Sequence, residues 1–174
     1  MSTAHIYGDP PAATCTEEAA FGYGLVPFVG KAWEATFQQY LPEGMRGITL
    51  RTSFVIGKKG GVFTILQRLV RWGLGGWAEY GQQGMSWIYQ KDLNRLITKS
   101  IEDLKYGGVY IASAPEPVSN VSFMKQLPKN MRILRGLPSR PWMIKIDAHS
   151  RRLPEVGFEF LFPWLSAAID DLLK

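Results

Sequence analysis

Residues 47–72 read GITLRTSFVIGKKGGVFTILQRLVRW and join two patterns of different period. The first ten residues are dense in β-branched and apolar side chains, which favours a strand over 47–56. Glycines around the two lysines indicate a loop over 57–61, and apolar residues at helical spacing then predict a helix over 62–72. The residues expected to face inward on that helix are Phe63, Ile65, Leu66, Leu69 and Val70. The stretch therefore predicts a strand, a turn and a helix in succession.

The same alternation continues on both sides of this stretch. Upstream, residues 2–7 are typical of the end of a strand, and a helix is predicted over 27–41 with Pro27 in its first turn. In that helix the apolar residues at helical spacing are Phe28, Ala32, Ala35, Phe37 and Leu41. Downstream, we expect strands at 86–89 and 109–112, helices at 92–104, 120–127 and 163–173, and an extended piece at 158–162. Strands alternating with helices predict an α/β fold: a partial Rossmann-like parallel sheet of about three strands with helices, plus a small carboxy-terminal appendage.

Positive charge is concentrated in one segment of the 174-residue chain, whose formal charge is +5. Between residues 125 and 152, eight basic residues stand against one acid, Asp147. Such a segment is either an ordinary solvated face or a contact for an anionic partner, namely a lipid headgroup, an RNA or an acidic protein. The eight residues are Lys125, Lys129, Arg132, Arg135, Arg140, Lys145, Arg151 and Arg152.

Several chemistries have no motif in this sequence. Cys15 is its one cysteine, so a disulfide framework and a cysteine-rich zinc site are excluded, and no metal site is predicted. The glycine-rich stretches 57–61 and 73–76 match neither a dinucleotide fingerprint nor a Walker loop. No apolar run reaches the roughly 18 residues of a spanning helix, so no transmembrane segment is expected.

Eight short phrases occur in order along nearly the whole chain. They are SxxxxYGD (2–9), TEE (16–18), KxWE (31–34), LRTSFVIGKKGG (50–61), GLGG (73–76), MSWIYxxDL (85–93), APEPVSN (114–120) and LPEVGFEFxFPxL (153–165). Together they resemble the atypical extended short-chain dehydrogenase/reductases called the epimerase family. The resemblance implies the carboxy-terminal half of a Rossmann-like dehydrogenase domain over 1–118. It implies a remodelled, basic version of the family's small carboxy-terminal domain over 119–174.

The resemblance also draws attention to two departures from the family pattern. Family members carry a G-x-x-G-x-x-G fingerprint in their first half, and this sequence contains none. We therefore expect no cofactor for the isolated chain, and NAD(P) only if a partner supplies that half. Short-chain dehydrogenases also use a tyrosine followed four residues later by a lysine. Here Tyr23 is followed at that spacing by Pro27, and Lys31 is preceded at that spacing by the same Pro27.

Site residues follow from the resemblance by position alone. Thr3 falls where the catalytic Ser/Thr hydroxyl of the family lies. The strand end expected to approach the cofactor and substrate carries Arg51, Thr52 and Ser53. The loop and strand expected to close over the substrate carry Gln83, Trp87 and Tyr89.

These expectations favour a degenerate, non-catalytic dehydrogenase-like protein that serves as a structural or accessory subunit of a larger complex. One alternative is the substrate-side half of a split NAD(P)-dependent oxidoreductase or epimerase completed by another chain. Another is a module that contacts phosphate or nucleic acid through 125–152. A bare strand edge at the amino end predicts an obligate protein partner there. A reducing intracellular compartment is expected, mitochondrial or in another organelle.

Overall fold

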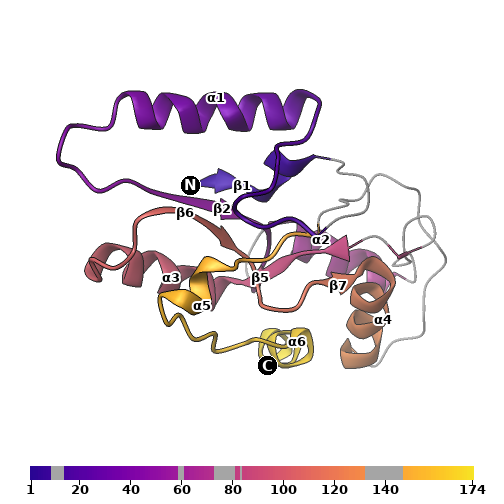
Figure 1. The fold of residues 1–174 in the computed structure, drawn as a ribbon. Helices are drawn as coiled ribbons and strands as arrows, with labels where there is room; N and C mark the ends of the chain where they lie inside the picture. Colours follow the sequence, from indigo (N-terminus) through magenta and orange to yellow (C-terminus); the bar gives the residue numbers. More distant parts are fainter. Residues whose placement is uncertain (9–13, 59–60, 73–80, 83, 132–146) are drawn as a thin grey trace.

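The computed structural model describes residues 1–8, 14–58, 61–72, 81–82, 84–131 and 147–174 (Figure 1). The strands are β1 (Ser2–Thr3), β2 (Ile48–Thr52), β3 (Phe54–Ile56), β4 (Gly84–Met85), β5 (Trp87–Tyr89), β6 (Gly108–Ala112) and β7 (Val118–Ser119). The helices are the 3₁₀ turn η1 (Ala4–Tyr7), α1 (Leu25–Gln39), α2 (Gly61–Arg71), α3 (Gln90–Glu102), α4 (Asn120–Met131), α5 (Arg152–Glu155) and α6 (Leu165–Leu173).

A parallel sheet of order β1-β2-β6 forms the centre of the fold. Ser2 lies opposite Arg51, and the β2–β6 ladder runs in register from Ile48 and Gly108 to Thr52 and Ala112. The predicted α/β fold with a small, Rossmann-like parallel sheet is therefore confirmed. Because the strands are parallel, their carboxyl ends meet at one edge of the sheet.

The strand predicted over 47–56 is interrupted at Ser53, which corrects the sequence expectation. The Ser53 backbone N–H bonds the Ala112 carbonyl at the end of β6, whereas the next N–H, of Phe54, bonds the Ser86 carbonyl. The chain thus changes neighbours at this residue, and β3 continues in parallel with β5. A short antiparallel pair of β4 and β7, which the sequence did not predict, lies beside it.

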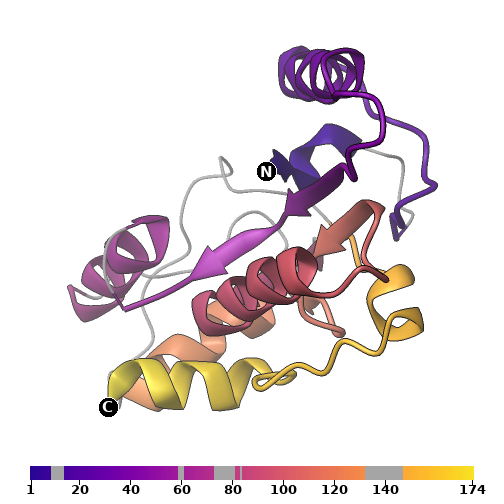
Figure 2. The same cartoon turned by 90° about the vertical axis from the view of Figure 1, so that its left-hand side faces the viewer.

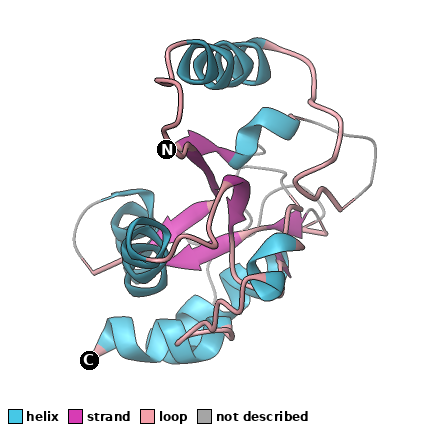
Figure 3. Ribbon diagram, turned by 60° about the vertical axis from the view of Figure 1, so that its left-hand side comes forward, coloured by secondary structure: helices cyan, strands magenta, loops and turns pink. Residues whose placement is uncertain are grey.

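Helices cover the two faces of the sheet unequally. Figure 1 shows α1 crossing alone above β1 and β2, while α3, α5 and α6 lie on the other side. The view turned by 90° and the view coloured by secondary structure show the same isolated helix at the top (Figures 2 and 3). Among the described helices, none combines the length and apolar character that a bilayer crossing requires.

Two main apolar clusters hold these layers together. One joins β3 and β5 to α2, α4 and α6, and contains Phe63, Trp87 and Ile169. The other packs α3 and α5 against β2 and β6, with Leu96 and Tyr110 fully buried. The first cluster contains residues from both predicted domains, and the division at 118/119 stays a prediction.

Candidate functional site

Hydroxyl groups gather where the parallel strands end. Thr3 closes β1, Thr52 closes β2 and is followed by Ser53, and Ser113 follows the last residue of β6. In open parallel α/β sheets, ligands bind in the crevice outside these carboxyl ends. This edge of the sheet is therefore the candidate site, and it contains three of the seven residues that the resemblance singled out for catalysis or binding.

Thr3 is partly exposed and shapes the turn that leaves β1. Its side-chain oxygen accepts a hydrogen bond from the backbone N–H of His5 at 3.2 Å, which caps η1. A threonine hydroxyl that accepts one bond still has a proton to donate. Burial lowers the pKa of His5, which favours the neutral imidazole beside this turn. Thr3 is thus placed to offer a hydrogen bond at the end of the strand.

Ser53 and Ser113 differ in how their hydroxyls are used. The Ser53 hydroxyl donates to the Ala112 carbonyl at 2.7 Å and so joins the ends of β2 and β6. The Ser113 hydroxyl is buried and has no hydrogen-bond partner in the described structure. A buried hydroxyl without a partner costs free energy, so Ser113 marks a point where a bound molecule could make the missing bond. The sequence analysis had not singled out Ser113.

Arg51, which the resemblance placed near the cofactor, instead joins the sheet to α1. It is almost fully buried, and its Nε and Nη2 donate to the two carboxylate oxygens of Glu34 at 3.0 and 2.7 Å. Its Nη1 donates to the Tyr7 hydroxyl at 2.7 Å and to the Glu17 carbonyl at 3.0 Å. Four of the five N–H groups of the guanidinium are therefore occupied by protein.

Charge and burial act together on this cluster. Burial pushes the pKa of Glu34 upward, but the hydrogen bonds and charge of Arg51 outweigh it and hold that pKa below its usual value. Burial raises the pKa of Tyr7 to about 12, although the charge of Arg51 opposes the rise. Tyr7 is therefore a neutral donor or acceptor at ordinary pH, and the Arg51–Glu34 pair is fully ionised.

Of the predicted substrate-side residues, Trp87 and Tyr89 lie in the core, and Tyr89 contacts α6. Trp87 is buried in the first apolar cluster, and its indole N–H has no hydrogen-bond partner in the described structure. The Tyr89 hydroxyl donates to Asp171 at 2.6 Å, and Lys91 pairs with the same carboxylate at 2.6 Å. Burial and this carboxylate raise the pKa of Tyr89 well above its usual value. Gln83 lies outside the described residues.

Most of the eight basic side chains predicted over 125–152 are not described by the structure. The side chains of Lys129, Arg132, Arg135, Arg140 and Lys145 lie outside the described part of the chain. The three basic residues that are described are treated next, and an anionic partner for 125–152 stays a prediction.

The described basic residues are used in two ways. Arg152 donates to the carbonyls of Val109 at 2.7 Å and Gly107 at 3.0 Å and lies over the Tyr110 ring. The Arg152 guanidinium therefore binds carbonyl groups at the start of β6 and does not contribute to an open basic face. Lys125 and Arg151 are exposed.

Glu17 is a half-buried residue that the sequence analysis had quoted only as part of the TEE phrase. Its carboxylate accepts hydrogen bonds from the backbone N–H groups of Ile111 at 3.0 Å and Arg151 at 3.1 Å, and from the Ser150 hydroxyl. It thereby binds one backbone N–H on the free edge of β6 and the N–H of the residue that precedes α5. Its place in the TEE phrase was the one sequence signal that could have identified it.

Comparison with known proteins supports the resemblance over nearly the whole chain. The epimerase family protein SDR39U1 homolog, chloroplastic, of Arabidopsis thaliana is 26% identical over 97% of this chain and 52% of its own. Human epimerase family protein SDR39U1 is 26% identical over 81% of this chain and 53% of its own. The chain thus spans about half the length of these curated relatives. No family model matches the sequence.

Solved structures share the fold. Human SDR39U1 isoform 2, crystallised with NADPH, superposes with a TM-score of 0.88 at 24% identity, covering 98% of this chain and 63% of that one. A nucleoside-diphosphate sugar epimerase from Corynebacterium glutamicum gives a TM-score of 0.81 at 25% identity, covering 99% of this chain and 36% of its own. The expectation of no cofactor for the isolated chain is contradicted by the NADPH in the first of these structures.

Proposed function

We propose that this chain, an epimerase-family protein of the atypical extended short-chain dehydrogenase/reductase type, forms the substrate-side part of a site for a nicotinamide nucleotide. The observation that carries the proposal is the agreement of its fold with that of an NADPH-bound relative over 98% of its length. The reaction class would be epimerisation or oxidoreduction of a small substrate, because the structural neighbours include a nucleoside-diphosphate sugar epimerase and a dTDP-4-dehydrorhamnose reductase.

The carboxyl edge of the sheet fits such a ligand. The buried, unpartnered hydroxyl of Ser113 and the hydroxyl of Thr3 lie on strand ends of the same sheet. Bound NADPH supplies a hydride. The chain's own hydroxyls would orient the ligand and donate hydrogen bonds to a substrate oxygen as negative charge develops on it.

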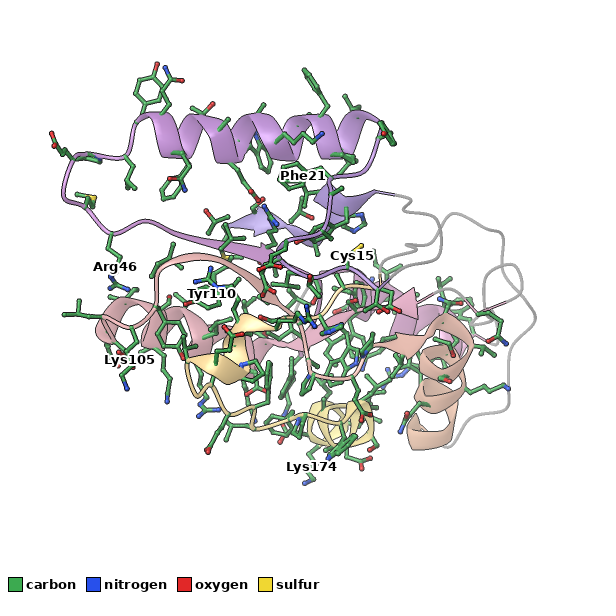
Figure 4. All side chains as sticks on the ribbon, viewed as in Figure 1. Cys15, Phe21, Arg46, Lys105, Tyr110 and Lys174 are labelled. Carbon is green, nitrogen blue, oxygen red and sulfur yellow. The ribbon has the colours of Figure 1, made fainter. Side chains whose placement is uncertain are left out.

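Tyr23 and Lys31 do not form the tyrosine–lysine pair that usually donates the proton in this family. Tyr23 precedes α1 and is 96% exposed, and the position four residues later is the buried Pro27. The Lys31 side chain lies over the Phe21 ring, 5.2 Å from its centre. Figure 4 shows Phe21 beneath α1. Proton transfer would therefore fall to another group, and Thr3 is the described hydroxyl that the family pattern places there.

A test follows by amide NMR of the full chain with NADPH. We expect chemical-shift changes at Thr3, Ser53 and Ser113. Ser113→Ala should weaken binding by about 2- to 10-fold, since it removes one neutral hydrogen bond. Ser100→Ala is the matched control, because the Ser100 hydroxyl donates within α3, to Ile97. No shifts at millimolar nucleotide, or shifts elsewhere in the chain, would contradict the proposal.

A non-catalytic accessory subunit is the second candidate. It is favoured by one observation: Arg51 and Tyr89, expected near cofactor and substrate, both make protein contacts that hold the fold together. An accessory subunit would bind the nucleotide but leave both NADPH and an added sugar nucleotide unchanged. Turnover of either compound, followed by NMR, would exclude this candidate.

An organellar location belongs to the same proposal. The Arabidopsis relative is named as chloroplastic, which supports an organelle without indicating which one. The mitochondrion is the compartment we propose for this chain, and fractionation of cells that express it would show whether it sediments with mitochondrial markers.

A further inference from the structure

The outer face of α2 carries apolar and basic side chains together. Ile65 is 53% exposed and Trp72, which directly follows the helix, is 81% exposed. Spacings of three and four residues place Ile65, Arg68 and Trp72 on one flank, and the exposed Arg71 lies one turn beyond Arg68. These four side chains are the outer face of α2, and Figure 2 shows this helix on the outside of the molecule.

The opposite face of α2 holds the helix firmly in the fold. Phe63, Leu66 and Val70 are at most 2% exposed and belong to the first apolar cluster. Trp72 is kept on the last turn, because its backbone N–H bonds the Arg68 carbonyl at 3.1 Å. The outer face is therefore presented by a packed helix, so a partner would not have to order it first.

The sequence around α2 is basic. Residues 44–78 contain six basic residues and no Asp or Glu. Arg46 and Arg51 are used within the fold, as their bonds to backbone carbonyls and to a buried carboxylate show. Arg68 and Arg71 instead form no ion pair with any residue that the structure describes. Their charge is available at the surface, and it favours an anionic partner.

The two apolar side chains indicate which anionic partner fits. Phosphates of a nucleic acid would use the arginines, and a base could stack on Trp72, but neither gives the aliphatic Ile65 a contact. The surface of an anionic bilayer uses all of them. Basic side chains bind its headgroups, tryptophan favours the layer between water and acyl chains, and aliphatic groups reach the edge of the acyl chains.

We propose that the outer face of α2 binds the surface of a membrane that contains anionic lipids. Arg68 and Arg71 lie against lipid phosphates, and Ile65 and Trp72 enter the headgroup layer. Two charges and two apolar side chains give weak, reversible attachment to the surface, which needs no spanning helix. None of these side chains belongs to the carboxyl edge of the sheet, so the proposal stands apart from the nucleotide site.

Sedimentation of the full chain with lipid vesicles tests the charges. We expect binding to vesicles of equimolar phosphatidylcholine and phosphatidylglycerol, not to phosphatidylcholine alone, and weaker binding as salt is added. A double variant, Arg68→Gln with Arg71→Gln, should bind about 25-fold more weakly, since each basic residue near such a surface contributes about fivefold. Lys99→Gln with Lys105→Gln removes two exposed charges at α3 and just beyond it, and should leave binding unchanged within about twofold.

Tryptophan fluorescence tests the apolar contact. Trp72→Ala should weaken vesicle binding at least about fivefold. Trp33→Ala is the control, since Trp33 is 61% exposed on α1, and it should bind as the wild type does. Brominated phosphatidylcholine in the same vesicles should quench part of the fluorescence. Trp72→Phe should still bind but lose that quenching.

Four results would overturn the proposal. They are no sedimentation with anionic vesicles, equal binding to neutral vesicles, equal losses in the α2 and α3 double variants, and quenching that persists in Trp72→Phe. A single-stranded RNA oligonucleotide is the alternative probe. If it removes the chain from the vesicles, and the α2 double variant loses RNA binding to the same extent, the outer face belongs to a nucleic acid. Urea unfolding midpoints equal to that of the wild type would show that the variants are folded.

Discussion

Arg51 is the residue that attaches α1 to the sheet. Its side chain and that of Glu34 are 5% and 13% exposed, and Phe21 and Tyr7 enclose the guanidinium. Most of the α1 surface is uncovered, so this ion pair is a large share of what holds the helix. A buried pair adds little over an apolar pair of the same shape, but the loss of one partner is costly.

Removing one partner should therefore destabilise the chain strongly. We expect Arg51→Met to reduce the free energy of unfolding by about 3 kcal/mol, because Glu34 is left charged and buried. Lys91→Met is the control, since Lys91 forms an ion pair while 52% exposed and should contribute at most about 1 kcal/mol. Urea unfolding measures both, and equal losses would contradict this account of Arg51.

The Arg51–Glu34 pair also makes the stability of the folded chain depend on pH. The pKa of Glu34 is lowered in the folded chain, so its stabilising contribution is present above the unfolded value of about 4.3. That contribution is lost as pH falls through the lower, folded pKa. We expect the urea midpoint of the wild type to fall more steeply below pH ~4 than that of Glu34→Gln. Parallel curves would show that Glu34 is not responsible.

Sequence reasoning located important residues without identifying their tasks. Arg51 and Tyr89 were predicted for cofactor and substrate, and the structure uses both in protein contacts. Position in a motif indicates that a residue lies near a strand end, but the direction of a long side chain depends on partners elsewhere in the chain. Glu34 and Asp171 lie 17 and 82 residues away, so local patterns could not reveal these bonds.

Arg46 determines how one element, α3, ends. Its guanidinium donates to the carbonyls of Ser100, Ile101, Asp103 and Tyr106 at 2.7, 3.0, 3.3 and 2.6 Å. Figure 4 shows it reaching toward that end of α3. The last carbonyls of a helix lack partners within the helix and carry partial negative charge, so a cation there satisfies both needs.

Loss of this cap should loosen the carboxyl end of α3. We expect Arg46→Ala to cost about 1–2 kcal/mol and Arg46→Lys to cost less, because an ammonium keeps the charge but not the forked geometry. Arg71→Ala, at an exposed position in the last turn of α2, is the comparison. Thermal unfolding measures the three variants, and an Arg46→Ala protein as stable as wild type would contradict the capping role.

Most of the helices could be predicted from periodicity, whereas their surroundings could not. α3 forms near its expected place, with Leu93 and Leu96 buried, but Ile65 on α2 is exposed although it was expected inward. The apolar residues of α1 recur at helical spacing, yet Phe28 is exposed. Periodicity shows which residues share a face, but not whether anything covers that face. The extended piece expected at 158–162 pairs with no described strand, and Asp92 instead binds the backbone N–H groups of Leu161 and Phe162.

The molecule as a whole is joined by contacts between its two predicted domains. Tyr89 and Lys91 both bind Asp171 of α6, and Asp92 holds the segment that leads into that helix. The apolar cluster around Trp87 includes Leu165 and Ile169 from the same helix. We therefore expect residues before and after position 118 to unfold together.

Calorimetry tests whether the residues before and after position 118 unfold together. We expect the described contacts to give a single cooperative transition, with equal calorimetric and van't Hoff enthalpies. Tyr89→Phe should shift that transition downward by a few degrees without dividing it, because one hydrogen bond of about 1 kcal/mol is lost. Two separate transitions would instead support independent domains over 1–118 and 119–174.

The position of Met1 has a practical consequence for anyone who produces this protein. Its side chain lines two cavities beside β1, of about 150 and 350 Å³, whereas Lys174 ends α6 on the opposite side of the molecule in Figure 1. An affinity tag or fluorescent fusion ahead of Met1 would emerge into the groove beside β1 and obstruct it. The same tag placed after Lys174 would leave that groove accessible.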